Sequence, residues 1–115
     1  MITKKLQQWD IVKVRVRPED QDEHPAILFS PQEIIDAGNV SRVTVIYGTT
    51  KRPAQTIREG QILLNGADGL EHLTLFDVSQ IYTIPKTIIR KKLGSIGAER
   101  RRILKRTIIA TYRLV

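Results

Sequence analysis

The sequence predicts a mainly β fold, a small barrel of about six short strands followed by one basic C-terminal helix. Turn-forming residues divide residues 10–85 into short runs rich in Val, Ile, Leu and Tyr, a pattern typical of small barrels. After Gly97, apolar residues instead recur at helical spacing. No repeat, linker or low-complexity stretch interrupts residues 1–115, so we expect a single domain.

Six apolar runs, each bounded by Pro, Gly, Asn or Asp, are expected to be strands. They lie at about residues 11–17, 25–29, 42–48, 61–64, 73–76 and 81–84. In the first run, valines alternate with Lys13, Arg15 and Arg17. Because successive side chains of a strand point to opposite faces, we expect the valines to pack and the cations to form a surface that can hold an anion.

Two helices are expected. The segment SPQEIIDAG predicts a single turn, with Ser30 as N-cap, Pro31 at the first helical position, Glu33 at the capping-box position and Gly38 as its end. The long helix follows Gly97, where Ile103, Leu104, Thr107, Ile108 and Thr111 recur at intervals of three and four residues. Its arginines and lysines lie largely elsewhere on the wheel, so we expect it to cap the barrel and expose a basic side.

Positive charge is concentrated in the last quarter of the chain. Residues 1–85 hold nine Lys/Arg against eleven Asp/Glu, whereas residues 86–115 hold ten Lys/Arg against Glu99 alone. Such a segment suits nucleic acid, an acidic protein or an anionic membrane surface. A solvated helix face explains the same charges equally well.

Composition excludes several classes of site. The chain has no cysteine, which excludes disulfides and thiolate metal sites and fits a reducing cytoplasm. The acidic residues at 20–23 have no histidine-rich partner at metal-ligand spacing, so we expect neither a metal nor another cofactor. No window approaches the roughly 18 apolar residues of a spanning helix, and the first ten residues do not resemble a signal peptide. We expect a soluble, cytoplasmic protein with no membrane partner.

The chain resembles the MazF/PemK toxin family in four stretches that follow one another in the family's order. These are WDIVKVRV from Trp9, HPAILFSP from His24, VTVIYGTT from Val43, and LFDVSQIYTIPKTIIRKKLGSIGAE from Leu75, before a closing helix. The resemblance implies an SH3-like barrel, usually a homodimer, that acts as the growth-inhibiting toxin of a bacterial toxin–antitoxin pair. Members of the family are metal-independent endoribonucleases that cut single-stranded RNA.

The family reaction implies specific roles for residues of this chain. The ribose 2′-hydroxyl attacks the adjacent phosphate, which leaves a 2′,3′-cyclic phosphate and a free 5′-hydroxyl. In the family, an arginine just before the proline of the second strand and a threonine at the end of the third do this work. Here Pro25 matches the proline, Thr49 the threonine with Thr50 beside it, and His24 stands in place of the arginine.

The histidine at position 24 changes what the site can do. An imidazole exchanges protons near neutral pH more readily than a guanidinium, so His24 is a candidate catalyst. It lacks the five-donor fork that clamps a phosphate. We expect Arg17 to restore the missing cation, with Arg15, Lys51 and Arg52 as further RNA-binding cations.

Each of these residues also has an ordinary structural explanation. His24 can be a solvated residue at the start of a strand, and Thr49 and Thr50 can simply end one. Gln80 matches a polar position that the family places near the RNA groove, yet it can equally finish a turn. An acid–base pair of His24 with His72 is not favoured by the sequence, because nothing fixes the distance between them.

The expected partners are single-stranded RNA and an acidic, partly disordered antitoxin that would be attracted to the cationic C-terminal segment. The family resemblance implies that the acidic loop at residues 17–23 gates the RNA groove. Two other functions stay open. One is a degenerate barrel that binds RNA or an acidic protein without cutting. The other is a regulatory dimer whose basic helix binds DNA, although the sequence has no recognisable helix-turn-helix pair, which makes specific groove reading weak.

Overall fold

A computed structural model describes residues 5–15 and 23–114. In this part of the chain, six strands form one sheet: β1 (Asp10–Val14), β2 (His24–Leu28), β3 (Arg42–Thr50), β4 (Gln61–Leu64), β5 (Thr74–Pro85) and β6 (Lys91–Ser95). The α-helices are α1 (Gln32–Asp36) and α2 (Ala98–Tyr112), and the short 3₁₀ turns are η1 (Gly66–Asp68) and η2 (Lys86–Ile88). The prediction of a mainly β fold with about six strands and a C-terminal helix is confirmed.

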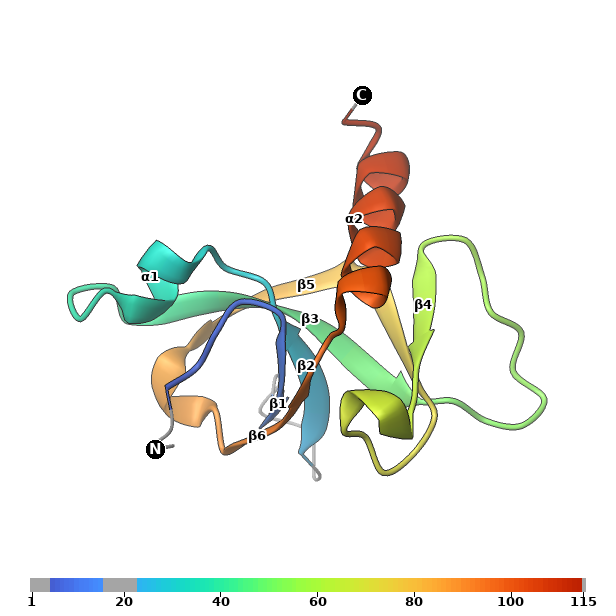
Figure 1. Cartoon of the computed structure of the whole chain (residues 1–115), viewed down its shortest axis with the longest axis horizontal. Helices are drawn as coiled ribbons and strands as arrows, with labels where there is room; N and C mark the ends of the chain where they lie inside the picture. Colours follow the sequence, from blue (N-terminus) through green and yellow to red (C-terminus); the bar gives the residue numbers. More distant parts are fainter. Residues whose placement is uncertain (1–4, 16–22, 115) are drawn as a thin grey trace.

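The sheet is antiparallel throughout, in the order β4-β5-β3-β2-β1-β6. β3 and β5 are its longest strands and cross the middle of the molecule, while α2 stands up from one side with the C-terminus at its far end (Figure 1). The β3–β5 pairing shifts register between Ile46 and Gly48. Such a bulge increases local twist and helps a flat sheet to curl.

The central strands bury both faces of the curled sheet. One core contains Ile11, Ile27, Ile46 and Phe76 and extends to Leu104 of α2. The other core lies on the opposite face and combines alternate residues of the same strands, such as Val12, Val14, Leu28 and Val45, with Ile89. Burial on both faces explains why these strands are nearly continuous apolar runs.

The two edges of the sheet meet through a backbone contact rather than through a strand ladder. A Cβ placed on Gly69, just after η1, would lie 2.3 Å from the carbonyl oxygen of Leu93 in β6. A Cβ on Gly94 would lie 2.1 Å from the carbonyl oxygen of Asp68. Only glycine permits this approach, and Gly69 also has a φ of 93° that disfavours other residues. The loop after β4 therefore closes the barrel against β6.

Helix α2 is fixed to the sheet at several points. Leu104 is fully buried, and Arg100 Nη1 donates to the Leu63 carbonyl at 2.9 Å while its Nε lies 3.4 Å from Asp68. Near the other end, the Tyr112 hydroxyl donates to the Val78 carbonyl at 2.6 Å. Arg102, Lys105 and Arg106 remain largely on the outside, as the sequence predicts. Among the described residues, no helix is long and apolar enough to cross a membrane.

Several strand boundaries differ from the sequence prediction. The predicted strands at 73–76 and 81–84 are one strand, β5, and β6 was missed. The first strand ends at Val14, and Arg15 follows it as irregular backbone. Its faces are not divided into packed and cationic sides, because Ile11 on the Lys13 side is also fully buried. Residues 16–22, which include Arg17 and most of the acidic loop, lie outside the described residues.

The predicted cap of the first helix is wrong. Pro31 occupies the N-cap position, no side chain caps the helix, and the helix ends at Asp36 rather than at Gly38. The Ser30 hydroxyl instead accepts a hydrogen bond from the Thr44 amide at 2.7 Å. Ser30 is thus used to hold the helix connection against β3, which is a tertiary contact that local sequence rules do not detect.

Candidate functional site

A cavity of about 340 Å³ opens at the end of the barrel where β1 and β3 end and β2 and β5 begin. It is lined by Lys13, Glu23, His24, Pro25, Thr50, Leu70, Glu71, His72, Thr74 and Leu93. The wall therefore combines an ammonium, two imidazoles, two carboxylates and two hydroxyls over an apolar floor. Its volume lies within the usual range for small-ligand pockets.

The strand register brings Lys13, His24 and Thr50 to this cavity. In β1 and β2, Lys13 pairs with Pro25 and Val14 pairs with His24, so the end of one strand lies beside the start of the next. Thr50 is the last residue of β3 and pairs with Thr74, the first residue of β5. Four strand ends thus place polar side chains around one opening.

An aromatic row connects His24 with Gln80 across three strands. The ring of His24 lies 5.0 Å from that of Tyr47, at an interplanar angle of 55°. Tyr47 in turn makes an edge contact with Tyr82, with ring centroids 6.0 Å apart. The Tyr82 hydroxyl donates to Gln80 Oε1 at 2.8 Å. This row orients the imidazole and leaves the amide nitrogen of the exposed Gln80 side chain at its far end.

The two threonines at the end of β3 occupy different surroundings. Both are exposed, but Thr50 lines the cavity and Thr49 does not. Side-chain alternation along β3 puts Thr49 on the same face as Tyr47, whose ring contacts His24. His24 is therefore flanked by Thr50 in the cavity and by Thr49 on the Tyr47 face of the sheet.

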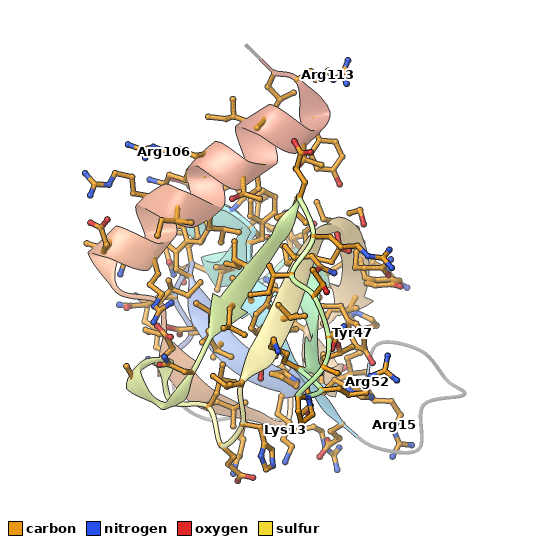
Figure 2. All side chains as sticks on the ribbon, turned by 90° about the vertical axis from the view of Figure 1, so that its right-hand side faces the viewer. Lys13, Arg15, Tyr47, Arg52, Arg106 and Arg113 are labelled. Carbon is orange, nitrogen blue, oxygen red and sulfur yellow. The ribbon has the colours of Figure 1, made fainter. Side chains whose placement is uncertain are left out.

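The predicted RNA-binding cations lie at the same end of the molecule. Figure 2 shows Lys13, Arg15 and Arg52 near Tyr47, away from Arg106 and Arg113 on α2. The Arg52 amide donates to Gln55 Oε1 at 3.0 Å, which fixes the turn after β3. Lys51 folds back onto that turn, and its Nζ lies 3.1 Å from the Arg52 carbonyl. Arg52 is exposed and thus better placed than Lys51 to meet a ligand.

Sequence reasoning missed the contribution of the loop between η1 and β5. This loop brings Glu71 and His72 to the wall of the same cavity that Lys13 and His24 line. No sequence signal indicates the placement, because it depends on the glycine contact that folds the loop back against β6. The sequence does not favour a pair of His24 with His72 because it does not fix their distance; the structure places both residues in the lining of one cavity.

The carboxylates at the cavity do not form a metal centre. Within residues 5–15 and 23–114, no group of three or more His, Cys, Asp or Glu side chains is placed to hold a metal ion. Glu23 Oε2 instead lies 3.0 Å from Arg90 Nε, which keeps that carboxylate partly neutralised at the rim. The basic and hydroxyl groups of the cavity are suited to an anionic ligand.

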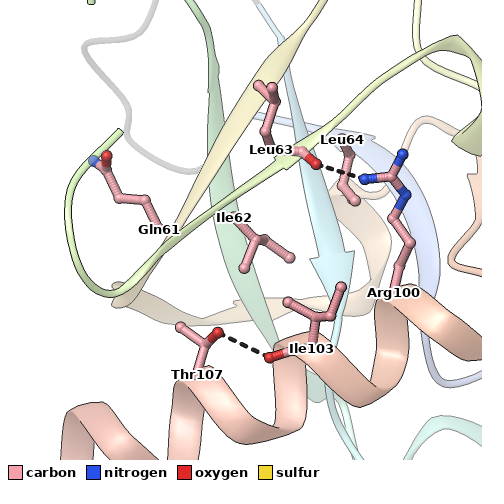
Figure 3. A pocket seen from close by; sticks show the side chains of 7 residues that line it. All are labelled: Gln61, Ile62, Leu63, Leu64, Arg100, Ile103 and Thr107. Atoms are coloured by element: carbon pink, nitrogen blue, oxygen red, sulfur yellow. Dashed lines mark hydrogen bonds between the residues drawn. The ribbon is translucent and has the colours of Figure 1, made fainter. Parts of the chain in front are cut away.

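A second hollow, of about 260 Å³, lies between β4 and α2. Figure 3 shows that the polar groups there already have partners: Arg100 donates to the Leu63 carbonyl, and Thr107 donates to the Ile103 carbonyl at 2.8 Å. The remaining lining includes Ile62, Leu64 and Ile103. This hollow contains no histidine or carboxylate and is therefore less suited to proton transfer than the cavity at the barrel end.

Comparisons with known proteins agree with this architecture. The Mycobacterium tuberculosis toxin MazF-mt6 is 15% identical over 90% of this chain and 96% of its own, with a TM-score of 0.73. An endoribonuclease in complex with its cognate antitoxin, from a mycobacterial species, is 15% identical over 94% of this chain and 95% of its own, with a TM-score of 0.76. At these identities the likeness shows the fold.

The family match extends over nearly all the residues that form the fold. No curated protein matches the sequence. The family described as PemK-like, MazF-like toxin of type II toxin–antitoxin system matches residues 7–112, a span that includes every strand and α2. The chain therefore belongs to the PemK-like, MazF-like toxin family of type II toxin–antitoxin systems.

Proposed function

We propose that this protein is a metal-independent endoribonuclease that cuts single-stranded RNA and so inhibits growth as the toxin of its pair. The observation that carries the proposal is the cavity at the barrel end, where His24, Lys13 and Thr50 meet in a chain of this family. RNA supplies its own nucleophile, the 2′-hydroxyl. The protein has only to move two protons and to stabilise extra negative charge on the phosphate.

His24 exchanges a proton with the reacting RNA in this proposal. The imidazole lies against the Tyr47 ring, and His24 lines the cavity. Histidine is the side chain best suited to proton transfer near neutral pH. The Thr49 hydroxyl donates to a non-bridging phosphate oxygen from the Tyr47 face, while Arg15 and Arg17 supply positive charge. The cyclic phosphate remains on one product, and the other leaves with a 5′-hydroxyl.

Bases next to the cleaved phosphate are recognised mainly by hydrogen bonds. Gln80 presents an amide at the end of the aromatic row, and Lys51 and Arg52 follow Thr50, the last residue of β3. Exposed aromatic surface is scarce, because Phe76 is fully buried and Tyr47 is only 5% exposed. Stacking therefore contributes less here than at typical single-strand binding surfaces.

Control of the enzyme requires a protein partner. A solved structure of this fold is an endoribonuclease in complex with its cognate antitoxin. We propose an acidic antitoxin segment as the partner of this chain as well, attracted by Arg102, Lys105 and Arg106 on the exposed side of α2. The acting form is a homodimer in the cytoplasm.

The proposal is tested by the products formed from a mixed-sequence RNA in the presence of a chelator. We expect 2′,3′-cyclic phosphate and 5′-hydroxyl ends, and a rate lowered about 10²–10⁴-fold by His24→Ala. Arg42→Ala is the matched control, because this exposed residue starts the neighbouring strand β3 at its opposite end. The control should cut like the unmodified protein.

Two results would contradict the proposal. Tight binding of single-stranded RNA without any cleavage would support a degenerate barrel that acts by binding. Cleavage that stops in chelator and returns with a divalent cation would show a metal-dependent enzyme instead.

A further inference from the structure

We infer that His72 is the second acid–base catalyst of this ribonuclease, paired with His24 across the cavity. The inference rests on the proposed function and names a residue that the family resemblance does not provide. Transesterification needs one group to accept the 2′-hydroxyl proton and another to donate a proton to the departing 5′-oxygen. A single imidazole cannot be in both protonation states at once.

The cavity brings two imidazoles to one space that is suited to an anionic ligand. His24 enters from the start of β2, and His72 enters from the loop before β5. The hydroxyl of Thr50 and the ammonium of Lys13 belong to residues that line the same cavity. A phosphodiester bound by Lys13 and Thr50 would therefore share one cavity with both histidines, and an in-line displacement needs two such groups, one to accept a proton and one to donate it.

The loop that carries His72 is held in place by its two ends. Leu70 is 7% exposed and belongs to the core, and the glycine contact at Gly69 fixes the preceding backbone against β6. Beyond His72, the Thr74 hydroxyl donates to the His72 carbonyl at 2.9 Å, and Thr74 itself is 2% exposed. Glu71 and His72 lie between these two buried anchors, and both line the cavity.

The earlier part of the same loop is also fixed. Asn65 and Asp68 form a reciprocal capping box around η1, and Asp68 lies 3.4 Å from Arg100 Nε of α2. Positioning of a catalytic side chain requires this kind of support, because a displacement of about 1 Å can cost 10²-fold in rate. The support comes from β4, β6 and α2, and not from the residues that react.

The proton balance of the step is complete with these two groups. One imidazole takes the proton of the 2′-hydroxyl as the new bond forms between the 2′-oxygen and phosphorus. The bond between phosphorus and the 5′-oxygen breaks, and the other imidazole, initially protonated, gives its proton to that oxygen. Exchange with water then restores both histidines to their starting states.

Charged residues of both signs line the cavity together with the histidines. Lys13 of β1 contributes a positive charge, whereas Glu23 before β2 and Glu71 beside His72 contribute negative ones. Glu23 is paired with Arg90. Thr50, Thr74 and Leu93 complete the wall without charge. We expect a bell-shaped dependence of kcat/KM on pH, with one limb from each histidine.

The test uses the full chain and an RNA whose scissile 5′-oxygen is replaced by sulfur. On ordinary RNA, His24→Ala and His72→Ala should each lower the rate about 10²–10⁴-fold, and each should remove one limb of the pH profile. Sulfur leaves without protonation, so the variant that lacks the acid should regain most of its rate on the sulfur substrate. The variant that lacks the base should not. The double variant should be little slower than the slower single one.

Leu73→Ala is the matched control, since Leu73 is the next residue of the same loop, is 47% exposed and lies outside the cavity wall. Its rate should be unchanged on both substrates. If the unmodified protein cuts RNA but His72→Ala cuts equally well, or if neither single variant is rescued by sulfur, the pair is wrong. If the unmodified protein does not cut RNA at all, the proposed function fails instead.

Discussion

Gly48 shows how a single residue permits the packing beneath the site. It stands between Tyr47, which contacts His24, and Thr49 at the end of β3. Phe76, the largest fully buried side chain, lies directly against it. A side chain at position 48 would occupy the space of that ring, so the core and the positions of the neighbouring site residues depend on the same glycine.

We predict that Gly48→Ala lowers the free energy of unfolding by about 1–3 kcal/mol, the usual cost of overpacking a core. An added Cβ would lie 2.6 Å from Phe76 Cε1, and the ring is held by the core on its other side. Urea denaturation measures the change. Gly38→Ala is the control, because a Cβ there meets nothing within 4 Å. Equal stability of Gly48→Ala and the unmodified protein would show that the ring can move away freely.

At the same scale, the sequence predicted some site residues better than others. His24, Thr50 and Arg52 are at the barrel end, as expected from their places at strand ends. The contact of His24 with Tyr47, and of Tyr47 with Tyr82, was not predicted, because it depends on the register of three strands. His72 was not predicted as a partner of His24 for the same kind of reason: a loop brings it there.

At the scale of elements, β5 explains why one strand resembles two in the sequence. Between its apolar halves, the Ser79 amide and hydroxyl both donate to Asp77 Oδ1, at 2.9 and 2.6 Å. Such local bonds are typical of a turn. The chain nevertheless continues through a bulge, because the Val78 amide donates to the Gly60 carbonyl and the Val78 carbonyl accepts from Tyr112. Tertiary partners thus satisfy backbone groups that a bulge would otherwise leave unpaired.

β6 was missed for the opposite reason. Its residues, KKLGS, have little intrinsic preference for a strand. It forms because it pairs with β1 and because Asp10, which is fully buried, lies 3.3 Å from Lys92 Nζ and accepts a hydrogen bond from Ser95. These partners are more than 80 residues apart in sequence, so no local pattern could reveal them. α2, in contrast, was predicted because its apolar spacing is local, although of the predicted apolar positions only Leu104 is buried and Ile103 is 44% exposed.

We predict that Leu104→Ala lowers the free energy of unfolding by about 2–5 kcal/mol. Leu104 is fully buried and joins α2 to the core that lies beneath the sheet, so truncation leaves a cavity that the curled sheet cannot easily fill. Ile109→Ala is the control on the same helix, because Ile109 is 40% exposed. Its change should stay within about 0.5 kcal/mol. Comparable losses in the two variants, measured by urea denaturation, would show that α2 contacts the sheet differently.

At the scale of the whole molecule, the cations are divided between two ends. Lys13, Arg15 and Arg52 lie at the end that contains the cavity, and Arg106 and Arg113 lie on α2, away from it (Figure 2). The sequence showed only that positive charge is concentrated after residue 85. The fold places the cavity of the proposed site at the end away from α2, near Lys13, Arg15 and Arg52, and Arg90 of the basic part of the chain pairs with Glu23 at its rim. RNA and an acidic partner can therefore be attracted to different surfaces.

This division predicts which cations RNA binding uses. Arg15→Gln with Arg52→Gln should make the plot of log K against log salt shallower by about 1.4, because each phosphate contact to a single strand contributes about 0.7 to that slope. Arg106→Gln with Arg113→Gln removes the same charge from α2 and should leave the slope unchanged. Binding is measured by fluorescence anisotropy with 2′-O-methyl RNA, which lacks the attacking hydroxyl. If the α2 pair changes the slope as much as the cavity-end pair does, the RNA extends along the helix and the cavity is not its only site of attraction.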